Sequence, residues 1–113
     1  MVTTGRVVIM SLKSVLKEEL ANSLQMRAAY ERELKLLPRG SLVGRKISGH
    51  VYYYLVYREA GKVRSVYKGK VSREELDRYR DAKKYRAKYR RLLSRVKRQI
   101  RFLKGAVRGN EPI

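Results

Sequence analysis

The sequence predicts an α+β fold in which a long helix, a three-stranded antiparallel β-meander and a long basic helix follow one another. Apolar residues recur three or four positions apart in both end segments of the 113-residue chain, as in helices that bury one face. From Pro38 to Val71 the pattern changes to runs of β-branched and aromatic residues between turn signals. The length fits one small domain. We therefore expect a single α-βββ-α domain over residues 11–104, with flexible ends at 1–10 and 105–113, and both Met1 and Met10 are candidate first residues.

The first predicted helix spans residues 12–37, because Ser11 is a suitable N-cap and Pro38 interrupts the pattern. Its five basic and four acidic side chains nearly cancel, which favours a scaffold over an anion-binding surface. The apolar positions have the spacing of a packed helix. They are Leu12, Leu16, Leu20, Leu24, Tyr30, Leu34 and Leu37.

Three strands are expected near residues 41–47, 50–58 and 62–70, separated by turns. Ser48-Gly49 forms the first turn, and Glu59-Ala60-Gly61 suits a type I turn with glycine in the left-handed position. Counting back from these turns sets the cross-strand register. The expected partners are Tyr57 with Val63, Tyr53 with Tyr67, and Tyr52 with Arg45 and Lys68.

This register sorts the strand residues onto two faces of the sheet. The face expected to join the core carries Leu42, Val51, Tyr53, Leu55, Tyr57, Val63 and Tyr67. The outward face carries Val43, Arg45, Ile47, His50, Tyr52, Tyr54, Val56, Arg58, Arg64, Val66, Lys68 and Lys70.

The second predicted helix begins at the capping box Ser72-Arg73-Glu74-Glu75 and ends near Gly105. Its apolar residues fall within an arc of about 100°, the width of a buried stripe. They are Ala82, Tyr85, Tyr89, Leu92, Leu93, Val96, Ile100, Leu103 and Val107. We expect the two helices to pack as an antiparallel hairpin or coiled coil, and a homodimer formed through the helices remains the alternative.

The charge of the chain predicts a polyanionic partner. The sequence holds 29 Lys and Arg against 10 Asp and Glu, a formal net charge of +19, which causes self-repulsion unless an anion neutralises it. Residues 72–104 alone carry 14 basic and four acidic side chains, and no acid follows Asp81 within that segment. We therefore expect the second helix to contact phosphates. The expected contacts are Lys83, Lys84, Arg90, Arg91, Arg95, Arg98 and Arg101.

The outward face of the sheet supplies the planar groups that base recognition requires. Tyr52 and Tyr54 are expected there, surrounded by cations, so this face is predicted to address grooves or exposed bases. The expected cations are Arg45, Arg58, Arg64 and Lys68. The alternative is that these tyrosines are ordinary cross-strand packing residues.

Catalysis, metals and cofactors are not predicted. The chain has no cysteine, His50 is its only histidine, and Glu74, Glu75 and Asp77 lie where they complement a helix dipole. The apolar run Val7–Met10 is too short for a signal sequence or a membrane span. We expect a non-enzymatic protein that is cytoplasmic and nucleoid-associated and does not bind membranes.

A multi-part pattern in the middle of the chain carries a family resemblance. It consists of Leu37-Pro38-Arg39-Gly40-Ser41, then Tyr52-Tyr53-Tyr54-Leu55-Val56-Tyr57-Arg58-Glu59, then Gly61-Lys62-Val63 before a charged helix. Over residues 37–78 this resembles a small uncharacterised prokaryotic family. More distantly, the order of three strands and a helix is similar to the arm-type DNA-binding domains of integrases and transposases, in which a small sheet addresses DNA.

The charge and the outward face of the sheet together predict a nucleic-acid-binding protein for which DNA is favoured over RNA. The resemblance to the small prokaryotic family implies little about function, and no catalytic residue carries over. The alternative from another class is a protein-interaction or antitoxin-like regulatory role, in which the cations meet an acidic protein partner.

Overall fold

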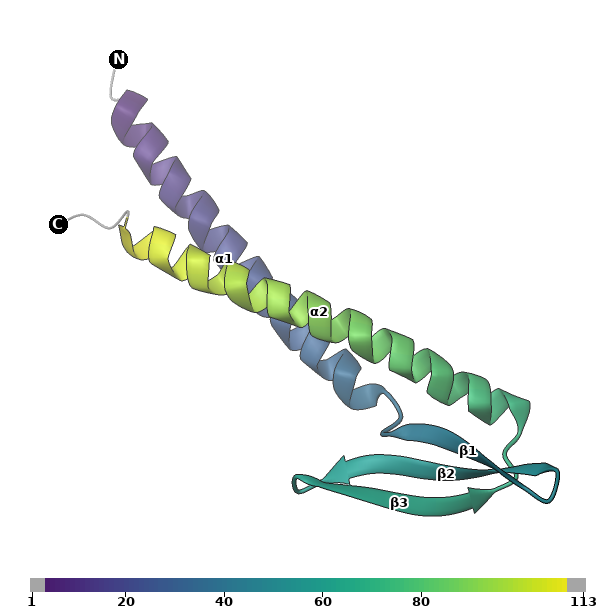
Figure 1. The fold of residues 1–113 in the computed structure, drawn as a ribbon. Coiled ribbons are helices and arrows are strands. Elements are labelled where there is room, and N and C mark those ends of the chain that lie inside the picture. The colour runs from purple at the N-terminus through teal and green to yellow at the C-terminus, as the bar shows by residue number, and fades with distance from the viewer. Residues whose placement is uncertain (1–3, 110–113) are drawn as a thin grey trace. The chain divides into compact units, whose positions relative to one another are not determined.

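The computed structural model describes residues 4–109, and side chains from Leu12 to Gly109. The elements are α1 (Thr4–Leu36), β1 (Ser41–Ile47), β2 (His50–Glu59), β3 (Lys62–Gly69) and α2 (Arg73–Gly109). The strands form one antiparallel sheet in the order β1-β2-β3 (Figure 1). The predicted α+β class and the order of the elements are therefore confirmed.

Contacts divide the chain into two compact units, where the sequence analysis expected one domain. The helical unit contains the described residues up to Lys35 and those from Tyr89 onward, and the sheet unit is Leu36–Lys88. Helix α2 contributes its first part to the sheet unit and its remainder to the helical unit.

In the helical unit, α1 and the C-terminal part of α2 run antiparallel and side by side (Figure 1). The rings of Tyr30 and Tyr89 lie 6.1 Å apart between their centroids. Ser23 lies seven residues before Tyr30 in α1 and is 1% exposed. Val96 lies seven residues after Tyr89 in α2 and is also buried. This equal spacing is what antiparallel helices with a shared seam require. The helix pairing predicted from the two stripes is therefore present.

Helix α1 begins before its predicted start, and helix α2 ends after its predicted end. Helix α1 begins at Thr4, so the prediction that Ser11 caps it is wrong; the preceding sequence contains no proline and continues the helix. Helix α2 passes through Gly105 and ends at Gly109. A glycine inside a helix costs about 1 kcal/mol relative to alanine, but Val107 continues the apolar stripe beyond it. Residues 4–10 and 105–109, expected to be flexible, are helical, while residues 1–3 and 110–113 lie outside the described part.

Both hairpins close through two-residue turns in which the backbone adopts positive φ. The values are 51° at Ser48 and 83° at Gly49, and 50° at Ala60 and 77° at Gly61. Such pairs form the turns whose twist matches that of antiparallel strands. In the first hairpin the predicted pairing of Arg45 with Tyr52 is confirmed.

The predicted register of the second hairpin is wrong by one residue. The expected turn was Glu59-Ala60-Gly61, a type I turn in which the glycine alone takes the left-handed conformation, and alanine seldom adopts positive φ. Ala60 does so here, and Glu59 consequently pairs with Lys62. A shift of one residue moves every side chain of β3 to the other face. The observed partners are Arg58 with Val63, Tyr57 with Arg64, and Tyr54 with Tyr67, in place of Tyr57 with Val63 and Tyr53 with Tyr67.

We name the two faces of the sheet by central residues of β2. The Leu55 face carries Leu42, Val51, Tyr53, Leu55 and Tyr57 as predicted, and it gains Arg64 and Val66 from β3. The Tyr54 face carries Val43, Arg45, Ile47, His50, Tyr52, Tyr54, Val56 and Arg58 as predicted, and it gains Val63 and Tyr67.

A β-bulge interrupts the pairing of β2 with β3 between Tyr53 and Tyr54. Tyr54 pairs with Tyr67 and Tyr53 with Gly69, so Lys68 is the extra residue. The predicted placement of Lys68 opposite Tyr52 is therefore wrong.

The beginning of α2 lies against the Leu55 face. Leu76 and Tyr79 from α2 border a hollow of about 220 Å³ together with Leu42 and Tyr53 from the strands. The side chain of Arg86 donates a hydrogen bond of 2.6 Å to the carbonyl oxygen of Pro38, which ties α2 to the segment before β1. These contacts leave the Tyr54 face as the open side of the sheet unit.

The predicted N-cap of α2 is confirmed. The backbone N–H of Glu75 donates a hydrogen bond of 3.2 Å to Oγ of Ser72, which satisfies one of the donors left free at a helix start. Gly40, which precedes β1, has φ of 85°, and a Cβ atom there would lie 2.5 Å from the carbonyl oxygen of Val56. Only glycine fits this entry into the sheet.

Candidate nucleic-acid interface

Three tyrosines form a connected cluster on the Tyr54 face. The ring of Tyr67 lies 5.3 Å from that of Tyr54 in an edge-to-face arrangement and 6.5 Å from that of Tyr52. The two-residue turn causes this cluster, because it places Tyr67 directly opposite Tyr54. Tyr52 and Tyr54 are half-buried, whereas Tyr67 is 57% exposed. The cluster therefore presents aromatic surface to solvent.

Arg45 and His50 border this tyrosine cluster. The guanidinium carbon of Arg45 lies 5.5 Å from the centre of the Tyr54 ring, within the range of a cation–π interaction. The imidazole of His50 meets the Tyr52 ring edge-to-face at 6.4 Å. An exposed cation held beside a ring is suited to a ligand that combines an anionic group with a planar one.

The structure separates the other three cations predicted for the sheet. Arg58 lies on the Tyr54 face as predicted and is exposed. Arg64 does not, because the register places it on the Leu55 face, where its Nε lies 3.5 Å from a carboxylate oxygen of Glu59. Lys68 is exposed at the bulge. Of the four predicted cations, Arg45 is the one in contact with the tyrosine cluster.

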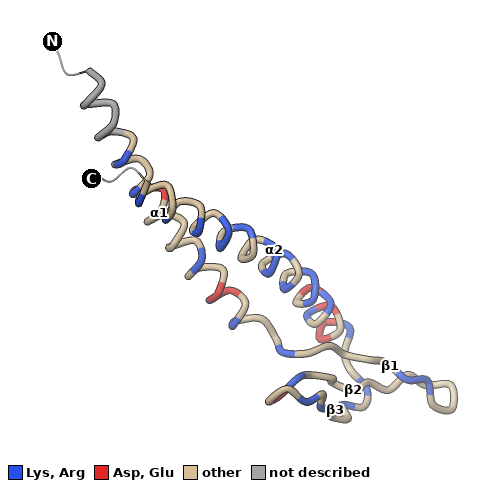
Figure 2. The backbone as a smooth tube through the Cα atoms, turned by 60° about the vertical axis from the view of Figure 1, so that its left-hand side comes forward, with Lys and Arg blue, Asp and Glu red and all other residues tan. Residues whose placement is uncertain are grey.

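The seven cations predicted along α2 are all exposed: Lys83, Lys84, Arg90, Arg91, Arg95, Arg98 and Arg101. Ion pairs within the described part of the chain join Arg27 to Glu31, Arg64 to Glu59 and Arg80 to Asp77, so none engages a cation after Arg80 in α2. Figure 2 shows the acidic residues of α2 confined to its beginning and basic residues along the rest. These cations are open to external anions.

One row of cations lies within the helical unit. Arg91, Arg95 and Arg98 are four and three residues apart, which places them on one face of α2. At a rise of about 1.5 Å per residue, their Cα atoms follow one another along the axis at intervals of about 6 and 4.5 Å. Lys83 and Lys84 belong to the sheet unit and provide cations there.

Sequence reasoning missed two aromatic residues. Tyr67 was assigned to the core face through the register error described above. Phe102 is 72% exposed and lies four residues after Arg98, on the same face as the row of Arg91, Arg95 and Arg98. The spacing of the sequence places Phe102 outside the apolar stripe and in the row of cations, so its exposure could have been predicted from helical periodicity.

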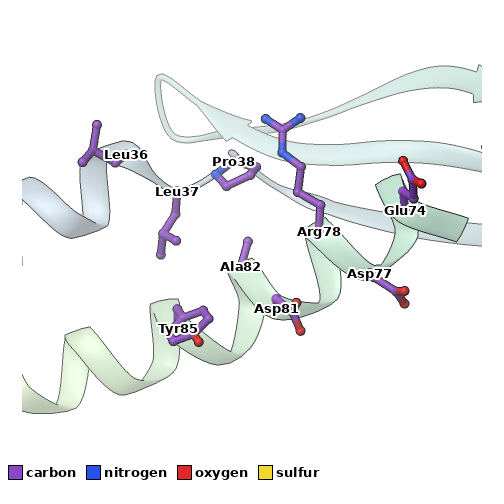
Figure 3. A pocket seen from close by; sticks show the side chains of 9 residues that line it. All are labelled: Leu36, Leu37, Pro38, Glu74, Asp77, Arg78, Asp81, Ala82 and Tyr85. Atoms are coloured by element: carbon purple, nitrogen blue, oxygen red, sulfur yellow. The ribbon is translucent and has the colours of Figure 1, made fainter. Parts of the chain in front are cut away.

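A groove of about 600 Å³ in the sheet unit marks the part of α2 that does not suit an anion. Figure 3 shows Leu37 directed toward α2 near Ala82 and Tyr85. The acidic residues Glu74, Asp77 and Asp81 line the same groove. Arg78 also lines this groove, but the three carboxylates outnumber it, and the part of α2 without acidic residues begins after Asp81.

None of the helices in the described part of the chain combines the length and apolar character that crossing a bilayer requires. Residues 11–78, more than half of the chain, match the model of a protein family described as a domain of unknown function (DUF6788). Searches of the curated proteins and of the solved structures find no match.

Proposed function

We propose that this chain, which belongs to the DUF6788 family, is a non-enzymatic nucleic-acid-binding protein that prefers DNA to RNA. In this proposal the cations of α2 contact phosphates, and the Tyr54 face contacts grooves or bases. The observation that carries the proposal is the run of exposed cations along α2 after Asp81, none of which forms an ion pair with a side chain of residues 12–109.

The electrostatics of α2 support a phosphate ligand. Exposed helices usually alternate charge signs, so that pairs four residues apart attract each other. In α1, Arg27 and Glu31 form such a pair at 3.7 Å. In α2 no acidic residue follows Asp81, and the neighbouring cations repel one another. Binding to a polyphosphate removes this repulsion and releases counterions from the nucleic acid.

The preference for DNA rests on the likeness of the strand and helix order to arm-type DNA-binding domains, which is an analogy of fold. Association with the nucleoid in the cytoplasm forms part of the same proposal. An acidic protein partner, as in an antitoxin-like regulatory pair, would use the same cations, and the following experiment separates the two.

The test reverses two charges in the row on α2. We expect Arg91→Glu with Arg95→Glu to weaken binding of a labelled duplex about tenfold or more, measured by fluorescence anisotropy at low salt. If both residues contact phosphates, the slope of log affinity against log salt becomes less negative by about 2. The matched control, Lys17→Glu with Arg32→Glu, makes the same change of net charge on α1.

An equal loss in the control variant would show that net charge alone governs binding and would contradict the assigned row. A wild-type protein that ignores nucleic acid but binds an acidic protein would favour the regulatory alternative. Circular dichroism verifies that each variant retains its helices.

A further inference from the structure

We propose that the Tyr54 face and Phe102 stack against unpaired bases, so that the preferred ligand is single-stranded nucleic acid. This inference rests on the proposed function and specifies its substrate class. It concerns base stacking, a chemistry that single-stranded DNA and RNA share.

The first argument is the composition of the Tyr54 face. Tyr67 is the most exposed ring of the tyrosine cluster, and Val63 and Val43 on the same face are also exposed. Exposed aromatic and apolar surface is poorly hydrated, and the flat face of a base covers it well. The guanidinium group of Arg45 lies beside the Tyr54 ring, where it can neutralise the phosphate of the stacked nucleotide.

The same face is poorly equipped to read a duplex. Readout in the major groove relies on arginine, lysine, asparagine or glutamine side chains that reach the base edges. The Tyr54 face contains no asparagine or glutamine, and of its two arginines Arg45 lies beside the Tyr54 ring while Arg58 lies four residues along β2 from Tyr54. Valine side chains offer no hydrogen bonds to the donors and acceptors of base edges. The side chains of this face are therefore better suited to stacking on the flat faces of bases than to hydrogen bonding with base edges.

Phe102 provides a second, independent argument from the helical unit. Ile100, two residues earlier, is 4% exposed and belongs to the buried stripe, whereas Phe102 projects from the row of Arg91, Arg95 and Arg98. A single strand that follows this row can place its phosphates on the guanidinium groups and turn one base onto the phenyl ring. In a duplex the bases remain stacked on each other and cannot reach that ring.

The experiment compares the full chain on three ligands of about 15 units: oligo-dT, oligo-rU and a DNA duplex. We expect either single strand to bind at least about tenfold more tightly than the duplex. Tyr67→Val and Phe102→Leu keep apolar volume but remove the ring, and each should weaken oligo-dT binding by about 5- to 150-fold, the range for loss of one stacked base. Duplex binding should change less than about twofold, because phosphate contacts remain.

Two variants serve as controls. Tyr67→Phe retains the ring and should restore oligo-dT binding to within about twofold of wild type. Tyr85→Leu removes a tyrosine that is also about half exposed but lies in the acidic groove, and it should leave binding unchanged. Circular dichroism establishes that the variants are folded, and the Tyr67→Phe result distinguishes loss of stacking from loss of structure.

Equal affinity for duplex and single strands, or unchanged oligo-dT binding by both Tyr67→Val and Phe102→Leu, would overturn this inference. The proposed function would then still stand if reversal of Arg91 and Arg95 abolished binding. Failure of wild type to bind any of the three ligands would instead refute the proposed function itself.

Discussion

The helical unit and the sheet unit differ in how they treat their apolar side chains. In the helical unit Val96, Ile100 and Leu103 are buried between antiparallel helices. In the described part of the sheet unit Ala82 is the only buried hydrophobic residue, while Val63 and Tyr67 are among several large side chains left exposed. Phe102 and Met26 are exposed in the helical unit as well, so the difference between the units is the buried seam, which the helical unit has and the sheet unit lacks.

This difference also separates two roles of tyrosine within the sheet unit. Tyr53 borders the hollow against α2 and supports the packing of the Leu55 face. Tyr67, on the other face, contacts mainly its cross-strand neighbours and solvent. Cross-strand pairs such as Tyr54 with Tyr67 contribute to the stability of the sheet unit, and the exposed side of the Tyr67 ring is not covered by the rest of this unit.

The largest expected effect comes from removing one buried side chain from the seam of the helical unit, which tests whether that seam stabilises it. We expect Ile100→Ala to lower the free energy of unfolding by about 2 to 4 kcal/mol, because it removes buried surface and leaves a cavity. Phe102→Ala, two residues away, should change the free energy of unfolding by less than about 0.5 kcal/mol because its ring is exposed. Urea unfolding followed by circular dichroism measures both. Similar losses in the two variants would contradict the assignment of buried and exposed faces.

A substitution with a smaller expected effect tests the turn between β2 and β3 in the sheet unit. Asparagine tolerates positive φ better than alanine and precedes glycine in the preferred two-residue turn, so Ala60→Asn should stabilise the sheet unit by about 0.5 to 1 kcal/mol. The change is measured as a shift in thermal midpoint. Destabilisation by this substitution would argue against the observed turn and against the register that places Tyr67 opposite Tyr54.

Most of the fold could be predicted from local signals. The cap at Ser72 depends only on a hydroxyl at the right spacing, and the pairing of Arg45 with Tyr52 follows from a glycine-containing two-residue turn. The second register could not be predicted in this way, because Ala60 adopts a backbone conformation that its side chain disfavours. The bulge at Lys68 is likewise a tertiary feature with no clear mark in the sequence.

Some residues of the candidate interface could be predicted from local signals, and others could not. The exposure of Arg91, Arg95 and Arg98 follows from helical periodicity alone, and their predicted positions agree with the structure. The tyrosine cluster depends on the register of β3, so an error of one residue removed Tyr67 from the predicted site and added Arg64 to it. Positions set by helical periodicity could be predicted here, whereas positions set by the second turn needed the structure.

The measurement that tests the central claim most directly is the salt dependence of binding by the unmodified chain. Labelled oligo-dT is titrated with protein over a series of potassium chloride concentrations. If about six cations contact phosphates, log affinity should fall linearly with log salt with a slope of about −4, as expected for a single strand. No binding at low ionic strength, or an affinity that does not change with salt, would contradict the claim that these cations exist to contact phosphates.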